Sequence, residues 1–72
     1  MYYKLRRGVL YKITEKAFRK AGNIYHAAKI LKIPKSTLSW YHTEKRIPPE
    51  KNLAKITEFI GYVLKRRDII KI

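Results

Sequence analysis

The sequence predicts an all-α protein: a compact bundle of four to five helices, to which the chain ends add at most a short terminal strand or arm. Two observations lead to this fold class. Apolar residues recur at spacings of three and four through most of the chain. Glycine and proline interrupt that pattern at a few points, which divide the chain into segments of helix length. Because 72 residues cannot divide their apolar side chains between two cores, residues 1–72 are expected to form a single domain.

A glycine and an asparagine separate the first two predicted helices. The first covers residues 9–21, where four apolar side chains share one face: Leu10, Ile13, Ala17 and Ala21. Gly22 is expected to end it, since glycine readily takes the positive φ of a C-terminal cap, and the Asn23 side chain can cap the helix that begins at Ile24. The apolar stripe of that second helix consists of Ile24, Ala27, Ala28 and Leu31.

Pro34 separates the second helix from the third. Proline disfavours α geometry at the residue before it, Ile33, and suits the first turn of a following helix. The third helix is therefore predicted to start near residue 34 or 35. It is expected to end between Thr43 and Lys45, ahead of two consecutive prolines.

The fourth predicted helix starts at Pro49. Glu50 then lies in its first turn, where a negative charge suits the helix dipole. The apolar side chains at helical spacing are Leu53, Ile56, Ile60, Val63 and Leu64. Gly61 is either a glycine inside this helix or its C-terminal stop.

Both ends of the chain allow alternatives. Residues 1–8 mix aromatic and basic side chains and form either a short strand or a basic N-terminal arm. Residues 62–72 form either a last helix or a strand, in which Ile69, Ile70 and Ile72 pair with residues 2–5. Four tyrosines outside residues 24–43 build either a dimer interface or part of a monomer core: Tyr2, Tyr3, Tyr11 and Tyr62.

The chain carries 18 Lys plus Arg against 5 Asp plus Glu, a formal net charge of +13. Charge this one-sided repels itself in a compact domain, and a polyanion relieves the repulsion while releasing its own counterions. Solubility alone requires less, since small domains usually carry a net charge of about 2 to 8. We therefore expect an anionic polymer as the partner.

Several function classes lack the residues that they require. Cysteine is absent, which excludes disulfides, thiolate metal sites and cysteine nucleophiles. No nucleophile with a base and no glycine-rich phosphate loop can be assembled, so the sequence predicts no enzyme, no cofactor and no small-molecule ligand. His26 and His42 are more simply surface donors near phosphate than metal ligands. No apolar run has the length of a signal peptide or a membrane span, which predicts a cytoplasmic protein without membrane contact.

Residues 24–43 have the spacing of a helix-turn-helix. Two helices cross steeply in that motif, so the first needs a small residue where the second packs against it, and Ala28 is predicted to be that residue. The predicted core of the motif consists of Ala27, Ala28, Leu31, Ile33, Leu38 and Tyr41. The outward side chains of the third helix are then Lys35, Ser36, Ser39, Trp40 and Thr43.

This pattern resembles the helix-turn-helix of the Cro and phage-repressor superfamily, also called XRE-like or lambda-repressor-like. The resemblance continues through the basic loop and prolines of residues 44–49 to a fourth helix followed by Gly61, and covers roughly residues 9–64. It implies a third helix in the major groove of double-stranded DNA, repressor-like activity and a homodimer. Lys32 departs from it, because the family often has glycine at this turn position, so a non-glycine residue is expected to take positive φ.

The candidate DNA-binding residues are Asn23, Tyr25, His26, Lys35, Ser36, Thr37, Ser39, Trp40, Thr43, Lys45 and Arg46. The three cations among them that flank the third helix are expected to contact phosphates, and the hydroxyl groups to contact phosphates or base edges or to cap helices. Trp40 either contacts sugar or a thymine methyl, or covers the edge of the core, because an error of one residue in helical phase exchanges it with Tyr41. Since the third helix has no Arg, Asn or Gln, direct base reading is expected to be modest.

Three functions remain open from the sequence. The leading hypothesis is a sequence-dependent, repressor-like regulator. The alternatives are an architectural or DNA-packaging protein that binds without regard to sequence, and a DNA-targeting module of a recombinase or transposase. The expected setting is the nucleoid, or the host cytoplasm for a viral protein. The abundance of Lys, Ile and Tyr without Cys hints at an archaeal or viral origin.

Overall fold

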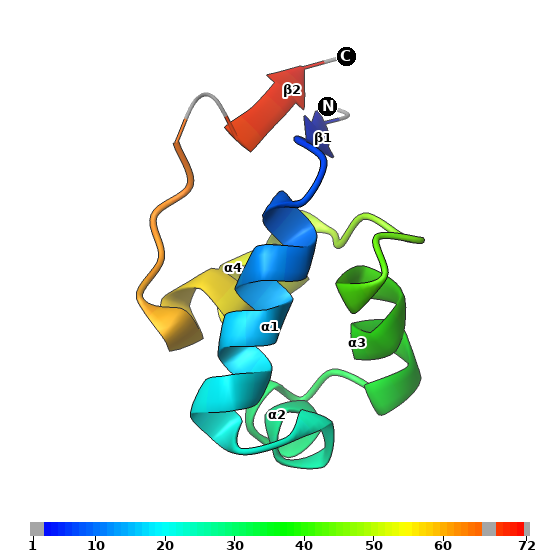
Figure 1. Ribbon diagram of the computed structural model, residues 1–72, viewed down its shortest axis with the longest axis vertical. Helices are drawn as coiled ribbons and strands as arrows, with labels where there is room; N and C mark the ends of the chain where they lie inside the picture. Colours follow the sequence, from blue (N-terminus) through cyan, green and yellow to red (C-terminus); the bar gives the residue numbers. More distant parts are fainter. Residues whose placement is uncertain (1–2, 66–67, 72) are drawn as a thin grey trace.

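Helices build the body of the molecule, and two short strands close one end of it. The computed structural model describes residues 3–65 and 68–71 of the chain. The elements within them are β1 (Tyr3–Leu5), α1 (Val9–Ala21), α2 (Ile24–Leu31), α3 (Lys35–His42), α4 (Glu50–Ile60) and β2 (Ile69–Lys71). The predicted all-α fold class, a small helical bundle, is confirmed. α1 runs through the middle and packs against the other three helices, with α3 and α4 on different sides of it (Figure 1).

The predicted boundary between the first two helices is confirmed. α1 stops at Gly22, whose φ of 103° is accessible to glycine and whose N–H donates to the Phe18 carbonyl. Asn23 then caps α2, since its side-chain oxygen accepts a hydrogen bond from the His26 N–H at 2.9 Å. These two residues provide hydrogen-bond partners at the end of one helix and the start of the next.

The turn between α2 and α3 contains the left-handed residue that the resemblance to the phage-repressor superfamily implies. Lys32 has a φ of 56° and a ψ of 41°, and its N–H donates to the Ala28 carbonyl. Pro34 directly precedes α3, which begins at residue 35 as predicted. α3 ends one residue before its predicted range, because Thr43 leaves helical geometry and Glu44 takes a φ of 60°.

Gly61 ends α4. Its φ is 68°, in the left-handed region, so the alternative that places this glycine inside a longer helix is wrong. Val63 and Leu64 therefore lie beyond α4 and not on it, and Val63 is 79% exposed. The spacing of apolar residues extended the predicted helix too far, because this spacing contains no information about backbone φ. At Gly61 the φ is positive, a value that only glycine adopts without strain.

At the chain ends the strand alternative is the one observed. β1 and β2 pair antiparallel, with Leu5 opposite Ile69 and Lys4 opposite Ile70. The predicted last helix is therefore wrong for this segment. Tyr2 and Ile72, which the sequence also assigned to the pairing, lie outside the described residues.

Asp68 holds the chain just before β2. Its carboxylate accepts hydrogen bonds from the Tyr62 hydroxyl and from the Lys65 N–H, both at 3.0 Å. Its carbonyl accepts a further bond from the Arg6 N–H at 2.8 Å, next to β1. One nearly buried acidic residue thus joins the two ends of the described chain.

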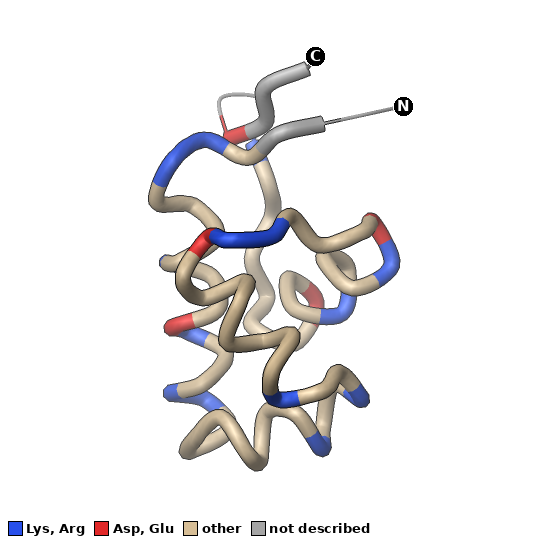
Figure 2. The backbone as a smooth tube through the Cα atoms, turned by 90° about the vertical axis from the view of Figure 1, so that its right-hand side faces the viewer, with Lys and Arg blue, Asp and Glu red and all other residues tan. Residues whose placement is uncertain are grey.

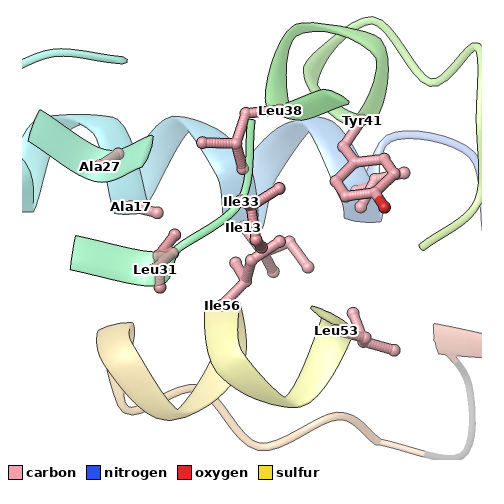
Figure 3. Packing of buried hydrophobic residues seen from close by; sticks show 10 residues of the cluster. Ile13, Ala17, Ala27, Leu31, Ile33, Leu38, Tyr41, Leu53 and Ile56 are labelled. Carbon is pink, nitrogen blue, oxygen red and sulfur yellow. The ribbon is translucent and has the colours of Figure 1, made fainter. Parts of the chain in front are cut away.

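One hydrophobic core contains residues of all four helices and of the turn after α2: Leu10, Ile13, Ala17, Ala27, Leu31, Ile33, Leu38, Tyr41, Leu53 and Ile56. Ile13, Ile33 and Ile56 lie together near its centre (Figure 3). Five of the six predicted core residues of the motif are buried there. Ala28 is only half-buried, and the fully buried small residue is Ala27. Ala28 still packs against the edge of the core, about 100° around the helix from Ala27.

Candidate nucleic-acid interface

α3 has an inward and an outward face. Leu38 and Tyr41 are buried in the core. The outward residues predicted from the sequence are all exposed: Lys35, Ser36, Ser39, Trp40 and Thr43. Trp40 is 38% exposed and Tyr41 only 3%, which settles the helical phase that the sequence left open. Thr37, also a candidate, is half-buried at the boundary between the two faces.

A lysine–tyrosine pair occupies the N-terminal end of the outward face. The Lys35 Nζ donates a hydrogen bond to the Tyr25 hydroxyl at 2.9 Å and lies 4.2 Å from the centroid of the ring. The pair joins the first turn of α2 to the first turn of α3. The hydrogen bond from Lys35, and then its charge, lower the pKa of Tyr25 below its usual range. A cation that lies beside two helix N-termini favours an anionic ligand at this end.

Asn23 and His26 flank Tyr25 at the start of α2, and both are exposed. The Asn23 Oδ1 atom accepts the His26 N–H, so the carbonyl half of the side chain serves the helix cap. Its amide NH₂ group can still donate hydrogen bonds to a ligand. The structure therefore places these two candidates on the surface next to the lysine–tyrosine pair.

An arginine–tryptophan stack occupies the C-terminal end of the outward face. The Arg46 Cζ lies 3.9 Å from the centroid of the Trp40 ring, and the Lys45 N–H donates to the Trp40 carbonyl at 2.9 Å. The loop after α3 thus brings a guanidinium group onto a helix that contains no arginine. The Thr43 hydroxyl donates to the Ser39 carbonyl at 3.0 Å, which leaves its oxygen as an acceptor. Sequence reasoning placed Arg46 at the helix end but missed the stack, since no periodicity connects a helix to the following loop.

His42 lies on the other face of α3, against α1. Its Nε2 is 2.8 Å from the Glu15 Oε2, and its ring stacks on Tyr11 with centroids 4.6 Å apart. The expectation of a surface donor near phosphate is therefore wrong for His42. The hydrogen bond with His42 lowers the pKa of Glu15, against the opposing effect of desolvation, and Arg19 lowers it further. Because 27 residues separate the pair, no local pattern signals it.

Glu44 caps α1 from the loop after α3. Its Oε1 accepts hydrogen bonds from the Gly8 N–H at 2.7 Å and from the Tyr11 N–H at 3.3 Å. Gly8 stands at the N-cap of α1 and has no side chain that could accept hydrogen bonds from the first N–H groups of the helix. The Glu44 carboxylate accepts them instead. The contact also fixes the loop that contains Arg46. Sequence reasoning missed this residue, although the lack of a capping side chain before residue 9 was a signal.

Acidic residues are absent from the middle of the chain. Residues 16–43, from within α1 to the end of α3, contain no Asp or Glu. Of the five acidic residues, Glu15, Glu44 and Asp68 make the contacts described above. Figure 2 turns the α3 side of the molecule toward the viewer and shows Lys and Arg spread over it, with few acidic positions. The outward face of α3 is therefore a positively charged surface.

The described part of the chain contains no group of three or more His, Cys, Asp and Glu side chains that could hold a metal ion. None of its helices combines the length and the apolar character needed to cross a membrane. Comparison with protein-family models, with curated proteins and with solved structures found no match to this chain.

Proposed function

We propose that this protein binds double-stranded DNA by placing α3 in the major groove, and that it acts as a repressor-like regulator. The outward face of α3 carries the proposal: exposed polar side chains within the acid-free residues 16–43, with Lys35 at one end and, just after Glu44, Lys45 and Arg46 at the other. The major groove admits an α-helix, and helix-turn-helix proteins place the second helix of the motif there. The resemblance to the Cro and phage-repressor superfamily supports the same docking. The proposed setting is the nucleoid within the cytoplasm.

In this docking the ends of α3 contact the DNA backbone and its middle faces the bases. Lys35 supplies a point charge to a phosphate, whereas Arg46 can offer two parallel N–H donors to one phosphate. The short hydroxyl side chains of Ser36 and Ser39 lie between these ends and can contact base edges. The exposed ring of Trp40 offers an apolar surface to a thymine methyl group. Most of the affinity is therefore electrostatic.

A salt titration with matched variants tests the phosphate contacts. Lys35→Ala is expected to weaken binding to all duplexes alike and to reduce the slope of log K against log salt by about 1. The control is Lys55→Gln, which removes the same charge from α4. It is expected to change the slope much less. Failure of the wild-type protein to bind any duplex at low salt would contradict the proposal.

Selection from random duplexes tests the regulatory part. Ser39→Ala is expected to alter the preferred sequence, while Lys45→Ala lowers affinity without altering preference. A homodimer belongs to this part of the proposal, with half-sites about 34 Å apart on a two-fold site. Sedimentation of the protein with and without the selected duplex measures its stoichiometry.

An architectural role is the second candidate function. One specific observation favours it: α3 contains no Arg, Asn or Gln, the side chains best suited to bidentate contacts with bases. Equal affinity for all duplexes at physiological salt would assign the protein to this role, with α3 docked in the same way. A reproducible preferred sequence in the selection would exclude it.

A further inference from the structure

A second basic surface lies on a different side of α1 from α3. Lys12, Lys16 and Lys20 follow one another at intervals of four residues along α1 and form what is called here the lysine row. All three side chains are exposed. They lie over the rings of Tyr62 and Phe59, at and just beyond the end of α4. Figure 1 shows that segment passing α1 on the side away from α3.

Contacts with aromatic rings hold the ammonium groups in place without neutralising them. The Nζ atoms of Lys12 and Lys16 lie 5.9 and 5.6 Å from the Tyr62 centroid, and that of Lys20 lies 5.0 Å from the Phe59 centroid. Lys20 also donates to the Phe59 carbonyl at 2.6 Å. Among the described residues, the side-chain ion pairs join Glu15 to Arg19 and His42, and none includes a lysine of the row. Within the described residues no carboxylate pairs with these three ammonium groups, so all three are available to an anionic ligand.

The spacing of the row suits a phosphate backbone. At 1.5 Å per residue, successive lysines are about 6 Å apart along the helix and the row is about 12 Å long. One DNA strand carries a phosphate for each 3.4 Å of duplex axis, so the row spans roughly three to four phosphates of one strand. Side chains that already rest on rings lose less entropy when they bind. The row offers charge alone, without the hydroxyl groups that face outward from α3.

The two basic surfaces point in different directions. Tyr11, Glu15 and Phe18 are the residues of α1 that contact His42 of α3. The centre of the lysine row lies roughly 130° around α1 from the centre of these three, at 3.6 residues per turn. A straight duplex docked on α3 therefore does not reach the row.

We infer that the lysine row binds the phosphates of a second DNA duplex, so that one protein molecule bridges two duplexes. The inference rests on the proposed function, because α3 must hold the first duplex. The added activity is the bridging of DNA: the protein can hold two distant segments of DNA side by side. Docking of α3 on one duplex does not require this activity.

A capture assay tests the bridging. One duplex is attached to beads, the wild-type protein is added, and retention of a second, fluorescent duplex is measured. Lys12→Gln/Lys16→Gln is expected to lower the affinity for the second duplex roughly 30-fold at about 0.15 M salt, since each lost phosphate contact costs about fivefold. The control variant is Lys29→Gln/Lys55→Gln, which removes the same charge elsewhere on the surface. The two double variants should have the same affinity for a single duplex in solution. Lys12→Arg/Lys16→Arg should retain capture, and thermal melting checks that all variants are folded.

Four outcomes would overturn the inference. One is a wild-type protein that binds a single duplex but never captures a second, which leaves the proposed function intact. Another is capture that the Lys12→Gln/Lys16→Gln variant retains, as expected for bridging by a dimer through two copies of α3. A third is an equal loss in the Lys29→Gln/Lys55→Gln control, which would assign the effect to net charge. The last is capture of phosphatidylserine vesicles but not of duplex, which would assign the row to a lipid surface. Absence of any duplex binding contradicts the proposed function itself.

Discussion

The two ends of α3 are held in different ways. At the C-terminal end, His42 contacts Glu15 and the following Glu44 contacts Gly8, across 27 and 36 residues of sequence. At the N-terminal end, Lys35 contacts the exposed Tyr25 of the neighbouring helix, 10 residues away, after the strained turn. Stability should therefore be concentrated at the C-terminal end. Both ends present cations that are proposed to contact phosphate, so substitutions at the two ends can show how far stability and DNA binding are separate.

Substitution of His42 is expected to have the largest effect. His42→Ala removes a half-buried ring that stacks on Tyr11 and contacts Phe18, together with the partner of Glu15. The free energy of unfolding should fall by about 2 kcal/mol. Urea unfolding measures it, with Ser39→Ala on the outward face as the control. Equal losses in the two variants would contradict the conclusion that the contacts of His42 with α1 hold this end of α3.

Glu44 should contribute less than His42 but more than any residue at the N-terminal end. Glu44→Ala removes the carboxylate from the N-terminus of α1 while keeping a Cβ at a φ of 60°, and should cost about 1 kcal/mol. Glu44→Gly removes the same cap but relieves the backbone strain, so its loss should be smaller. Thermal melting compares the two variants. If glycine is the more destabilising substitution, left-handed strain at this position is not significant.

The contact between Glu15 and His42 predicts a dependence of stability on pH. Because the pKa of Glu15 is lowered in the folded protein, its contribution is complete above the usual value of 4.5 and is lost as the pH falls through the lower folded value. The melting temperature of the wild type should therefore fall more between about pH 6 and pH 3 than that of Glu15→Gln. Parallel curves for the two proteins would show that this contact does not contribute.

The turn before the N-terminal end of α3 should give the smallest effect, and in the opposite direction. Lys32→Gly removes the Cβ from a residue at a φ of 56° and so relieves backbone strain. Glycine also raises the entropy of the unfolded chain, which offsets part of this gain, so the net stabilisation should be about 0.5 kcal/mol. Lys32→Ala keeps the strain and should not stabilise. Denaturant midpoints of the two variants measure the difference, and a gain with alanine would contradict this account of the turn.

Features that depend on neighbouring residues could be predicted from the sequence, whereas the exact end of a helix could not always be predicted. The ends of α1, the cap at Asn23 and the start of α3 after Pro34 were predicted because caps and proline act on their immediate neighbours. The left-handed turn at Lys32 was predicted from the resemblance to the phage-repressor superfamily, which often has glycine at this position. Val63 was misplaced because the period of apolar residues does not show where a helix stops.

By itself, the sequence determined the helical fold, most of the helix boundaries and the excess of positive charge. These follow from local backbone preferences, helical periodicity and composition. Only the tertiary structure decided that His42 contacts Glu15 of α1, that Glu44 caps a distant helix, and that Arg46 stacks on Trp40. Only the tertiary structure decided, too, that the lysines of α1 point away from α3. Each of these depends on how helices far apart in sequence pack together, and no local pattern contains that information.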